Sequence, residues 1–306
     1  MLNKYYKNID SQGFLNRYGL KYGICRALFI KNPIHISNEY EVNKVLWQKK
    51  ALKKIRKYLI YKNENPSGFT FSKEVFDNPM WIYWDKGIEN APQIIQKCYE
   101  SLVKYHGDKV ILLTEKNIKD FIIMPEYIEK KRTNGSIPIA GYTDLMRFAL
   151  LEHYGGTWID STIYLTGEIP SEIINCEFFA FQNSLGLLDN PVLFPAWFLH
   201  AKKHSKKITE IRNVAFAYWL KEKHVIEYLL PNLIITALID KDEYKKIPYM
   251  NSDYSEYLVK ILGDTYTDEK MNWVQKLTTI HKLTYKLDES IDRDDSIYHK
   301  LINEER

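Results

Sequence analysis

Strand-like and helix-like patterns of apolar residues alternate between residues 80 and 117. The run MWIYWDKG at 80–87 is apolar and then polar, which predicts a buried strand that ends in a turn. Residues 91–106 have apolar positions at helical spacing, with Pro92 suitably placed in a first turn, and KVILLTEKN at 109–117 predicts a second strand. This order predicts a βαβ unit in a parallel sheet, whose ligands bind at the carboxyl ends of the strands.

A helix followed by a strand is predicted for residues 142–165. Apolar side chains recur at i, i+3, i+4 and i+7, which indicates one buried helix face made of Tyr142, Leu145, Met146, Ala149, Leu150 and His153. Thr143 is expected to cap the helix N-terminus, and Gly155-Gly156 to end the helix. The β-branched and aromatic run TWIDSTIYL at 157–165 then predicts a strand, with Asp160 in it or at its end.

The second half of the chain carries weaker patterns. CEFFAFQNS at 176–184 predicts a further strand, and residues 192–239 are expected to be mostly helical. LTTIHKLTYKL at 277–287 predicts a late strand that carries His281, Lys282 and Lys286. Together the patterns predict an α/β fold with a mostly parallel central sheet.

The first 72 residues are predicted to form a helical, basic segment. Apolar residues recur at helical spacing through 42–62, and between positions 44 and 62 the charged residues are all basic: Lys44, Lys49, Lys50, Lys53, Lys54, Arg56, Lys57 and Lys62. Such a helix either lies on an anionic membrane surface or packs on the main domain by its apolar stripe, with its lysines in solvent. NENPSGFT at 63–70 is the expected linker, which divides the chain into a basic helical segment at 1–72 and a main domain at 73–306.

Composition narrows the class of protein. The chain has 306 residues, 45% hydrophobic and 27% charged, as in a soluble globular protein, and its net charge of +4 is too small to predict nucleic-acid binding by itself. Three widely separated cysteines without a CxxC pair predict neither a disulfide framework nor a cysteine zinc site, and fit a reducing cytosol. The N-terminus lacks a signal-peptide pattern, and the most apolar window is interrupted and too short to span a bilayer. We therefore expect a soluble or peripheral protein.

Two groups in the segment 142–165 are candidates for ligand binding. Asp160 either hydrogen-bonds its own turn or binds a ligand at a strand's carboxyl end. As a single carboxylate it needs a second protein ligand, or anionic oxygens from a substrate, to hold a metal. Asp144 and Arg147, three residues apart on a helix, either form a surface ion pair or place an acceptor beside a donor, which suits the adjacent hydroxyls of a sugar.

The predicted late strand offers three further candidates. His281 is either structural or a metal ligand, because an isolated histidine fits both roles. Lys282 and Lys286 are either solvated or supply positive charge for a phosphate group.

The segment 143–162 resembles a known family. Thr143-Asp144-Leu-Met-Arg147, Tyr154-Gly155-Gly156 and Trp158-Ile159-Asp160-Ser161-Thr162 are similar to the DXD-region glycosyltransferases. The similarity is greatest to the bacterial capsular polysaccharide synthesis family, which is similar to glycosyltransferase family 32. WIYWDKG, Gln96-Lys97-Cys98 and HKLTYK also resemble family positions, so the resemblance covers residues 78–287. The family motif is Asp-x-Asp, and the hydroxyl of Thr162 in place of the second carboxylate weakens the protein's share of metal coordination.

The resemblance implies a GT-A fold that binds a nucleotide-diphosphate sugar. It implies that Asp144 and Arg147 hold the donor sugar and serve catalysis, and that Asp160 and His281 bind Mn²⁺ or Mg²⁺ at the diphosphate. Trp84 is implied near the base and ribose, and Tyr142, Lys282 and Lys286 in the remaining substrate-binding set, with lysine charge stabilising the leaving diphosphate. It also implies UDP as the nucleotide and retention of the anomeric configuration.

The leading hypothesis from the sequence is a UDP-sugar-dependent hexosyltransferase of capsule or surface-polysaccharide synthesis. It would move galactose or glucose to a lipid-linked oligosaccharide, carried on polyprenyl diphosphate. It would act in the cytoplasm at the inner face of the cell membrane, where residues 44–62 contact anionic lipid, and nucleic acid is not an expected partner. Two alternatives stay open: a non-catalytic protein that binds anionic lipid or nucleic acid through 44–62, and a pseudoenzyme that binds a sugar nucleotide without transfer.

Overall fold

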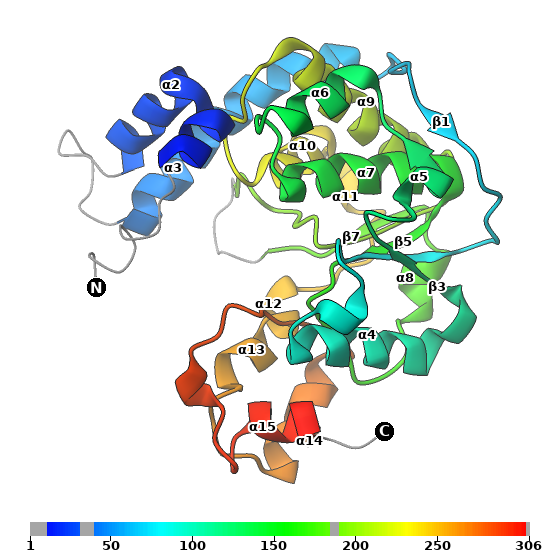
Figure 1. Cartoon of the computed structure of the whole chain (residues 1–306), viewed down its shortest axis with the longest axis vertical. Helices are drawn as coiled ribbons and strands as arrows, with labels where there is room; N and C mark the ends of the chain where they lie inside the picture. The colour runs from blue at the N-terminus through cyan, green and yellow to red at the C-terminus, as the bar shows by residue number, and fades with distance from the viewer. Residues whose placement is uncertain (1–10, 31–39, 184–189, 304–306) are drawn as a thin grey trace.

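The computed structural model describes residues 11–30, 40–183 and 190–303, with a five-stranded sheet at the centre (Figure 1). The described residues form one five-stranded sheet and two two-stranded sheets. The strands are β1 (Thr70–Phe71), β2 (Met80–Tyr83), β3 (Val110–Leu113), β4 (Ile122–Ile123), β5 (Gly156–Ile159), β6 (Ile163–Leu165), β7 (Phe178–Ala180), β8 (Phe198–Ala201) and β9 (Ile280–Lys282). Its helices are α2 (Ser11–Ile30), α3 (Tyr40–Ile55), α4 (Gln93–His106), α5 (Ile118–Phe121), α6 (Glu126–Thr133), α7 (Ile139–Tyr154), α8 (Ser171–Asn175), α9 (Lys206–Lys221), α10 (Leu230–Leu238), α11 (Lys241–Tyr244), α12 (Ser252–Ser255), α13 (Tyr257–Ile261), α14 (Asp268–Leu277) and α15 (Ile297–Asn303). A 3₁₀ helix, η1 (Arg56–Tyr61), continues α3.

The central sheet is mixed, so the expectation of a mostly parallel sheet is confirmed only in part: β8 alone runs against the other four strands. Its strand order is β3-β2-β5-β8-β7. β2 runs parallel to β3 and β5, as the predicted βαβ unit requires, whereas β8 runs antiparallel to β5 and β7. β8 lies within residues 192–239, which were expected to be mostly helical. Every residue of β8 is buried, so no alternation of polar and apolar positions marks it as a strand.

Helix α7 carries Asp144 and Arg147, and it begins earlier than predicted. Its first residue is Ile139, directly after a proline. Thr143 therefore lies inside the helix, where its hydroxyl donates to the carbonyl oxygen of Ala140 at 2.8 Å and does not cap the N-terminus. For the same reason Asp144 lies beyond the first turn, so the helix dipole does not explain its position.

The pair Gly155-Gly156 turns the chain from α7 into β5. Gly155 has a φ of 73° and its N–H donates to the carbonyl oxygen of Leu151 at 2.9 Å, which confirms the predicted helix end. Gly156 has a φ of 93°, and a Cβ there would lie 2.1 Å from the carbonyl oxygen of Pro79. Only glycine therefore lets β5 begin this close to β2, so that the carboxyl ends of the two strands meet at one edge of the sheet.

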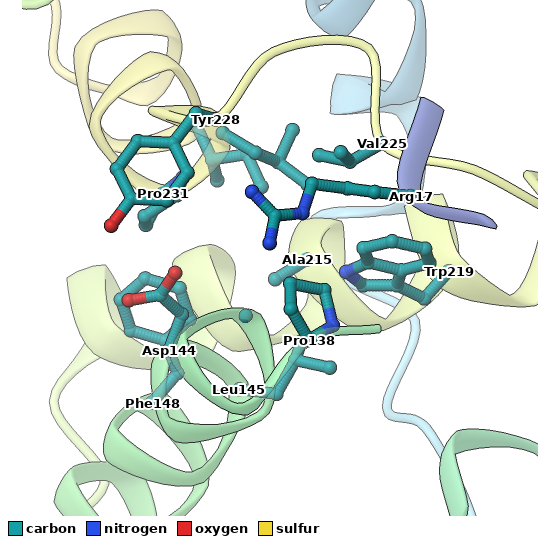
Figure 2. A pocket seen from close by; sticks show the side chains of 13 residues that line it. Arg17, Pro138, Asp144, Leu145, Phe148, Ala215, Trp219, Val225, Tyr228 and Pro231 are labelled. Carbon is teal, nitrogen blue, oxygen red and sulfur yellow. The ribbon is translucent and has the colours of Figure 1, made fainter. Parts of the chain in front are cut away.

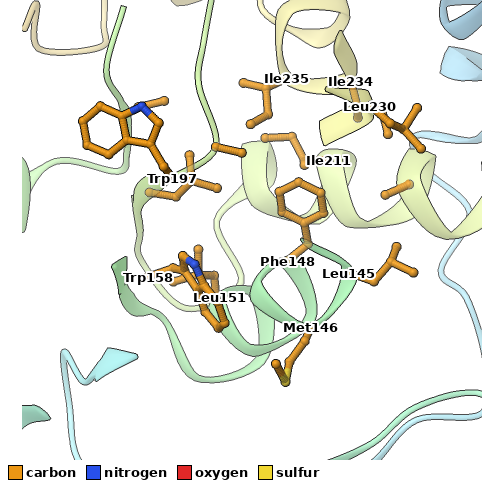
Figure 3. Packing of buried hydrophobic residues seen from close by; sticks show 14 of the residues in the cluster. Leu145, Met146, Phe148, Leu151, Trp158, Trp197, Ile211, Leu230, Ile234 and Ile235 are labelled. Carbon is orange, nitrogen blue, oxygen red and sulfur yellow. The ribbon is translucent and has the colours of Figure 1, made fainter. Parts of the chain in front are cut away.

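Buried side chains of α7, α9 and α10 form much of the core beside the sheet. Figure 3 shows Leu145 and Phe148 of α7 on the side that faces Ile211 of α9 and Ile234 of α10. All four side chains are 2% exposed or less. Burial of a side chain of this size stabilises the fold by about 1.5–3 kcal/mol. This packing therefore fixes the rotation of α7, and with it the direction of its charged side chains.

Helix α3 packs on the main body through its apolar stripe. Trp47 and Ile55 are buried in the same core cluster as residues of α7 and α10, and Lys54 pairs with Glu222 at 2.6 Å. Packing by the apolar stripe, one of the two interpretations left open by the sequence, is confirmed, and membrane contact by the basic side chains stays a prediction. Lys49, Lys53, Arg56 and Lys57 remain exposed. Within the described ranges no helix is both long and apolar enough to cross a membrane. The division into 1–72 and 73–306 stays a prediction.

The C-terminal helices α13, α14 and α15 form a second apolar cluster with α4, at the opposite end of the molecule from α2 and α3 (Figure 1). The predicted late strand is confirmed at β9, which pairs antiparallel with β6. In this register Lys282 lies opposite Ile163 and His281 lies opposite Tyr164. Because successive side chains of a strand point to opposite faces, His281 and Lys282 face opposite sides.

Candidate active site

A pocket of about 630 Å³ opens at the carboxyl ends of β2 and β5, the edge where the sequence predicted a ligand. Its walls come from residues 83–85, the N-terminal half of α7, residues 160–162 between β5 and β6, residues 196–197, the segment 228–232, and residues 282 and 285. Five candidates predicted from the sequence line it: Trp84, Asp144, Arg147, Asp160 and Lys282.

Asp160 is the first residue after β5. Its backbone N–H donates to the carbonyl oxygen of Trp197 at 2.9 Å, which aligns the turn with the sheet edge. One carboxylate oxygen, Oδ1, accepts from Trp158 Nε1 at 3.1 Å and lies 3.3 Å from an Arg147 nitrogen. The other, Oδ2, accepts from Lys282 Nζ at 2.9 Å. Asp160 therefore binds other elements of the pocket, and not merely its own turn.

Arg147 is a buried guanidinium that connects two carboxylates. The residue is only 5% exposed, and it donates to the carbonyl oxygen of Ala196. Its Nη2 lies 2.9 Å from Asp144 Oδ1 and 3.3 Å from Asp160 Oδ1. The guanidinium carbon also lies 5.0 Å from the centre of the Trp158 ring, a cation–π distance. Asp144 and Arg147 thus form a built part of the pocket wall, in contrast to a solvated surface pair.

The two carboxyl groups have opposite pKa shifts. The pKa of Asp144 is raised to about 6. Burial is the largest cause, Arg147 opposes it, and the negative charge of Asp160 adds to it. Burial also acts on Asp160, but the positive charges of Lys282 and Arg147 outweigh it and hold the pKa of Asp160 below its usual value. Of these two carboxyl groups, Asp160 has the lowered pKa and Asp144 titrates near pH 6, a separation typical of functional sites.

Lys282 reaches the pocket from the far end of the chain. Its ammonium donates to Asp160 Oδ2 at 2.9 Å and to Thr162 Oγ1 at 2.6 Å, and it lies 5.9 Å from the centre of the Trp197 ring. The register of β9 on β6 places it there, because Lys282 pairs with Ile163, the residue next to Thr162. The Lys282 ammonium is thereby fixed between the Asp160 carboxylate and the Thr162 hydroxyl.

Three predicted site residues lie outside this pocket lining. Tyr142 is 4% exposed, and its hydroxyl donates to Glu129 Oε1 at 2.7 Å, within the buried helix face that its spacing predicted. Lys286 is exposed, with its ammonium 6.0 Å from the centre of the Tyr285 ring. His281 is fully buried on the other face of β9, and its Nε2 lies 3.0 Å from Thr166 Oγ1. Burial lowers the pKa of His281 to about 4, so its ring is neutral at physiological pH.

The structure adds aromatic residues that the sequence did not mark. Tyr285 is 46% exposed and lies edge-on to Trp84, with ring centres 5.7 Å apart. Tyr228 is 53% exposed and lines the pocket; burial of its hydroxyl, together with Asp144 and Asp160, raises its pKa. Tyr285 lies within the run HKLTYK that resembles family positions, but the sequence did not single it out, and Tyr228 belongs to no local motif.

A smaller pocket of about 30 Å³ adjoins the first and shares Asp144, Tyr228 and Pro231 with it. Figure 2 shows Arg17 of α2 reaching into this small pocket from the side opposite Asp144. The Nε atom of Arg17 is buried without a hydrogen-bond partner. The N-terminal helix therefore contributes to the surroundings of the site, which no local pattern predicted.

The resemblance implies a divalent cation, which needs several oxygen or nitrogen ligands from the pocket side chains. Among the described residues, no group of three or more histidine, cysteine, aspartate or glutamate side chains is placed to hold a metal ion. Both oxygens of Asp160 already face cationic groups, and His281 does not line the pocket. Hard divalent cations take several oxygen ligands; Asp85 and Asp144 also line the pocket, but they are not grouped with Asp160 in a way that could hold the ion. These residues do not fit a resident Mn²⁺ or Mg²⁺ site.

The fold and the pocket define a mixed α/β protein with a charged ligand site at the carboxyl edge of its sheet. The chain belongs to the capsular polysaccharide synthesis protein family, whose family model matches residues 29–301. This confirms the family that the segment 143–162 resembles. A solved structure named PaToxG Glycosyltransferase is similar over 86% of this chain and 97% of that chain, at 14% sequence identity and a TM-score of 0.38, values too low to carry an argument. No curated protein matches the chain.

Proposed function

We propose that this protein is a glycosyltransferase of capsule synthesis that moves a hexose, galactose or glucose, from a UDP-sugar to an oligosaccharide on polyprenyl diphosphate. The observation that carries the proposal is the convergence of Asp144, Arg147, Asp160 and Lys282 in one pocket at the sheet edge. Membership of the family supports a role in polysaccharide synthesis. The α/β architecture, with its site at the carboxyl ends of parallel strands, supports the GT-A-like donor domain expected from the sequence.

The leaving diphosphate requires fixed positive charge. Breaking the bond between sugar and phosphate places negative charge on the leaving oxygen. Lys282, held by Asp160 and Thr162, stabilises this charge without reorganising during the reaction. Arg147, held by the Ala196 carbonyl oxygen and two carboxylates, adds a second fixed cation to the wall. These two cations carry the electrostatic part of the mechanism.

The donor sugar is oriented by Asp144. Above its pKa of about 6 the carboxylate is ionised and accepts hydrogen bonds from sugar hydroxyls. Arg147 Nη2, 2.9 Å from Asp144 Oδ1, keeps that carboxylate in place. The acceptor hydroxyl then attacks the anomeric carbon as the sugar develops oxocarbenium character. In the retaining route that the family resemblance implies, the bond from sugar to phosphate breaks and the leaving phosphate oxygen accepts the proton of the acceptor hydroxyl, so no dedicated base is needed.

The uracil and ribose of UDP are assigned to the Trp84 side of the pocket. Trp84 and the half-exposed Tyr285 form an aromatic pair at the end of β2. A flat base stacks on such rings, which typically contributes about 1–3 kcal/mol per base. Placing the base there directs the diphosphate toward Lys282, which lines the same pocket.

The exposed basic side chains of α3 and η1 support action at the inner face of the membrane. Lys49, Lys53, Arg56 and Lys57 are exposed on one short stretch of chain, and each basic residue near an anionic bilayer contributes about 1 kcal/mol. Replacing all four by glutamine is expected to abolish flotation with phosphatidylglycerol vesicles while leaving UDP binding unchanged. Unchanged flotation would contradict the assignment of this surface.

The proposed activity is tested by UDP release from a panel of UDP-sugars, with and without added acceptor. The wild-type chain is expected to release UDP from one donor. Asp160→Asn should lower this rate by about 100-fold, because it removes the counter-charge that holds Lys282 and Arg147. Asp242→Asn is the matched control, since the Asp242 side chain is 86% exposed and is not part of the pocket lining. A folded protein that neither binds nor cleaves any donor would refute the proposal.

A further inference from the structure

The Lys282 ammonium lies between the two functional side chains of the Asp160-Ser161-Thr162 motif. It donates to Asp160 Oδ2 at 2.9 Å and to Thr162 Oγ1 at 2.6 Å. In the Asp-x-Asp pattern that this chain resembles, the two outer positions are both carboxylates. Here one outer position is a hydroxyl, and a cation that belongs to the protein is bound across the pair.

Strand pairing of the backbone and packing of the side chain keep the Lys282 ammonium in place. Lys282 is the last residue of β9, and its backbone pairs with Ile163 of β6, beside Thr162. Thr162 is 8% exposed, and the Lys282 side chain is 22% exposed and lies over the Trp197 ring. The ammonium is therefore partly desolvated and fixed by three neighbours, in contrast to a surface lysine that samples many rotamers.

Asp160 already has two cationic partners without a metal. It pairs with Lys282 and Arg147, and Arg147 also pairs with Asp144, each within 3.3 Å; Asp85, the third carboxylate of the lining, forms none of these pairs. A divalent cation bound to Asp160 would lie directly beside the Lys282 ammonium and the Arg147 guanidinium, and like charges at such distances repel. The threonine hydroxyl adds no negative charge to offset this repulsion.

The ammonium retains one donor for a ligand. A lysine ammonium has three N–H donors, and Asp160 and Thr162 accept from two of them. The third is available to an anionic oxygen that enters the pocket.

We propose that Lys282 takes the place of the divalent cation: it binds the diphosphate of the donor directly, and donor binding requires no metal. This inference rests on the proposed function, since it assigns the diphosphate of a sugar nucleotide to the same pocket. Asp160 and Thr162 then act as positioning residues that hold Lys282, and Asp160 is not a metal ligand. Lys282 remains fixed before, during and after transfer.

The test measures binding of UDP to the full-length chain by isothermal titration calorimetry, once in EDTA and once with MnCl₂. The dissociation constant is expected to agree within about two-fold between the two conditions. Lys282→Met should weaken binding by about 10- to 100-fold in EDTA, the range of one lost charge-assisted hydrogen bond. Lys282→Arg should retain most of the affinity. Lys245→Met is the matched control, because the Lys245 side chain is 74% exposed and outside the pocket lining, so it should not change affinity.

The outcomes separate this inference from the proposed function. UDP binding that appears only with MnCl₂ would overturn the inference and leave a metal-dependent glycosyltransferase. Equal affinity of Lys282→Met and wild type would overturn it as well. Failure of the folded wild type to bind UDP in either condition would overturn the inference and the proposed function together. Should Lys282→Met not fold, as judged by circular dichroism, the wild-type comparison in EDTA and MnCl₂ and the Lys282→Arg variant still decide the matter.

Discussion

Replacing Asp144 by asparagine is expected to stabilise the protein above about pH 6 and to lower its transfer activity. Burial raises the pKa of Asp144 from 3.8 to about 6, opposed by Arg147 and assisted by Asp160. Between these two pH values the folded protein holds a proton that the unfolded chain has released, so its stability falls as the pH rises through that window. Asparagine has the shape of the protonated acid and cannot ionise, so the variant avoids this loss.

The size of the expected gain in unfolding free energy follows from the pKa shift of Asp144. From 3.8 to about 6 is about 2 pKa units, or about 3 kcal/mol of unfolding free energy once the carboxyl is ionised. The attraction of Arg147 is already contained in this shift, and Arg147 keeps Asp160 and the Ala196 carbonyl oxygen as partners. We expect a gain of about 2–3 kcal/mol at about pH 8, roughly 5–10 °C in Tm, and less than about 1 kcal/mol at about pH 4.

The assay is urea unfolding of both proteins at the two pH values, followed by tryptophan fluorescence. The two proteins share all other titrating groups. The change with pH in the difference between their unfolding free energies therefore reports on residue 144 and its interaction with Asp160. Asp242→Asn, at an exposed carboxylate, should show no such change. Equal stability differences at both pH values, or a variant less stable than wild type at about pH 8, would refute the raised pKa. Transfer should fall by at least about 10-fold, since an amide oxygen accepts weaker hydrogen bonds than a carboxylate.

Three further predictions concern the scaffold and the edge of the site. Arg212→Met leaves Glu152 buried without its guanidinium partner, and should lower the unfolding free energy by about 3–5 kcal/mol in urea titrations; a loss under about 1 kcal/mol would argue against a buried pair. Gly156→Ala places a Cβ 2.1 Å from the Pro79 carbonyl oxygen at positive φ, and should cost about 2–6 kcal/mol, seen as a lower Tm or as insoluble protein; a wild-type Tm would contradict this close approach. His281→Gln should leave the dissociation constant of UDP within about two-fold, measured by calorimetry, because the ring lies outside the pocket lining; a ten-fold loss would return His281 to the site.

The elements beside the site were predictable because each carries its own period. The strands β2 and β5 and the helix α7 appear in the sequence as short apolar runs and as a 3.6-residue repeat, and the structure confirms all three. The start of α7 was misplaced because its first residues, from Ile139 to Gly141, precede the apolar stripe that defines the pattern. β8 was missed because a short strand buried on both faces has no alternation, and its direction in turn makes the sheet mixed.

The site was predictable only where its residues share a local segment. Asp144, Arg147 and Asp160 lie within one helix, turn and strand, and the structure brings them together. The late strand offered His281 and Lys282 side by side, and local sequence does not decide between them. The pairing of β9 with β6 decides it, because that register turns Lys282 toward Asp160 and buries His281 on the opposite face.

The N-terminal segment also supports the site, although composition separates it from the main domain. The chain between α9 and α10 carries Tyr228 to the pocket wall and is held by α2. The N–H of Val225 donates to the carbonyl oxygen of Arg17 at 3.0 Å, and Arg26 pairs with Glu227 at 3.3 Å. The Glu227 side chain is 1% exposed, so loss of Arg26 would leave a buried, uncompensated charge next to Tyr228. The contacts of α2 therefore act directly on the segment that forms one wall of the pocket.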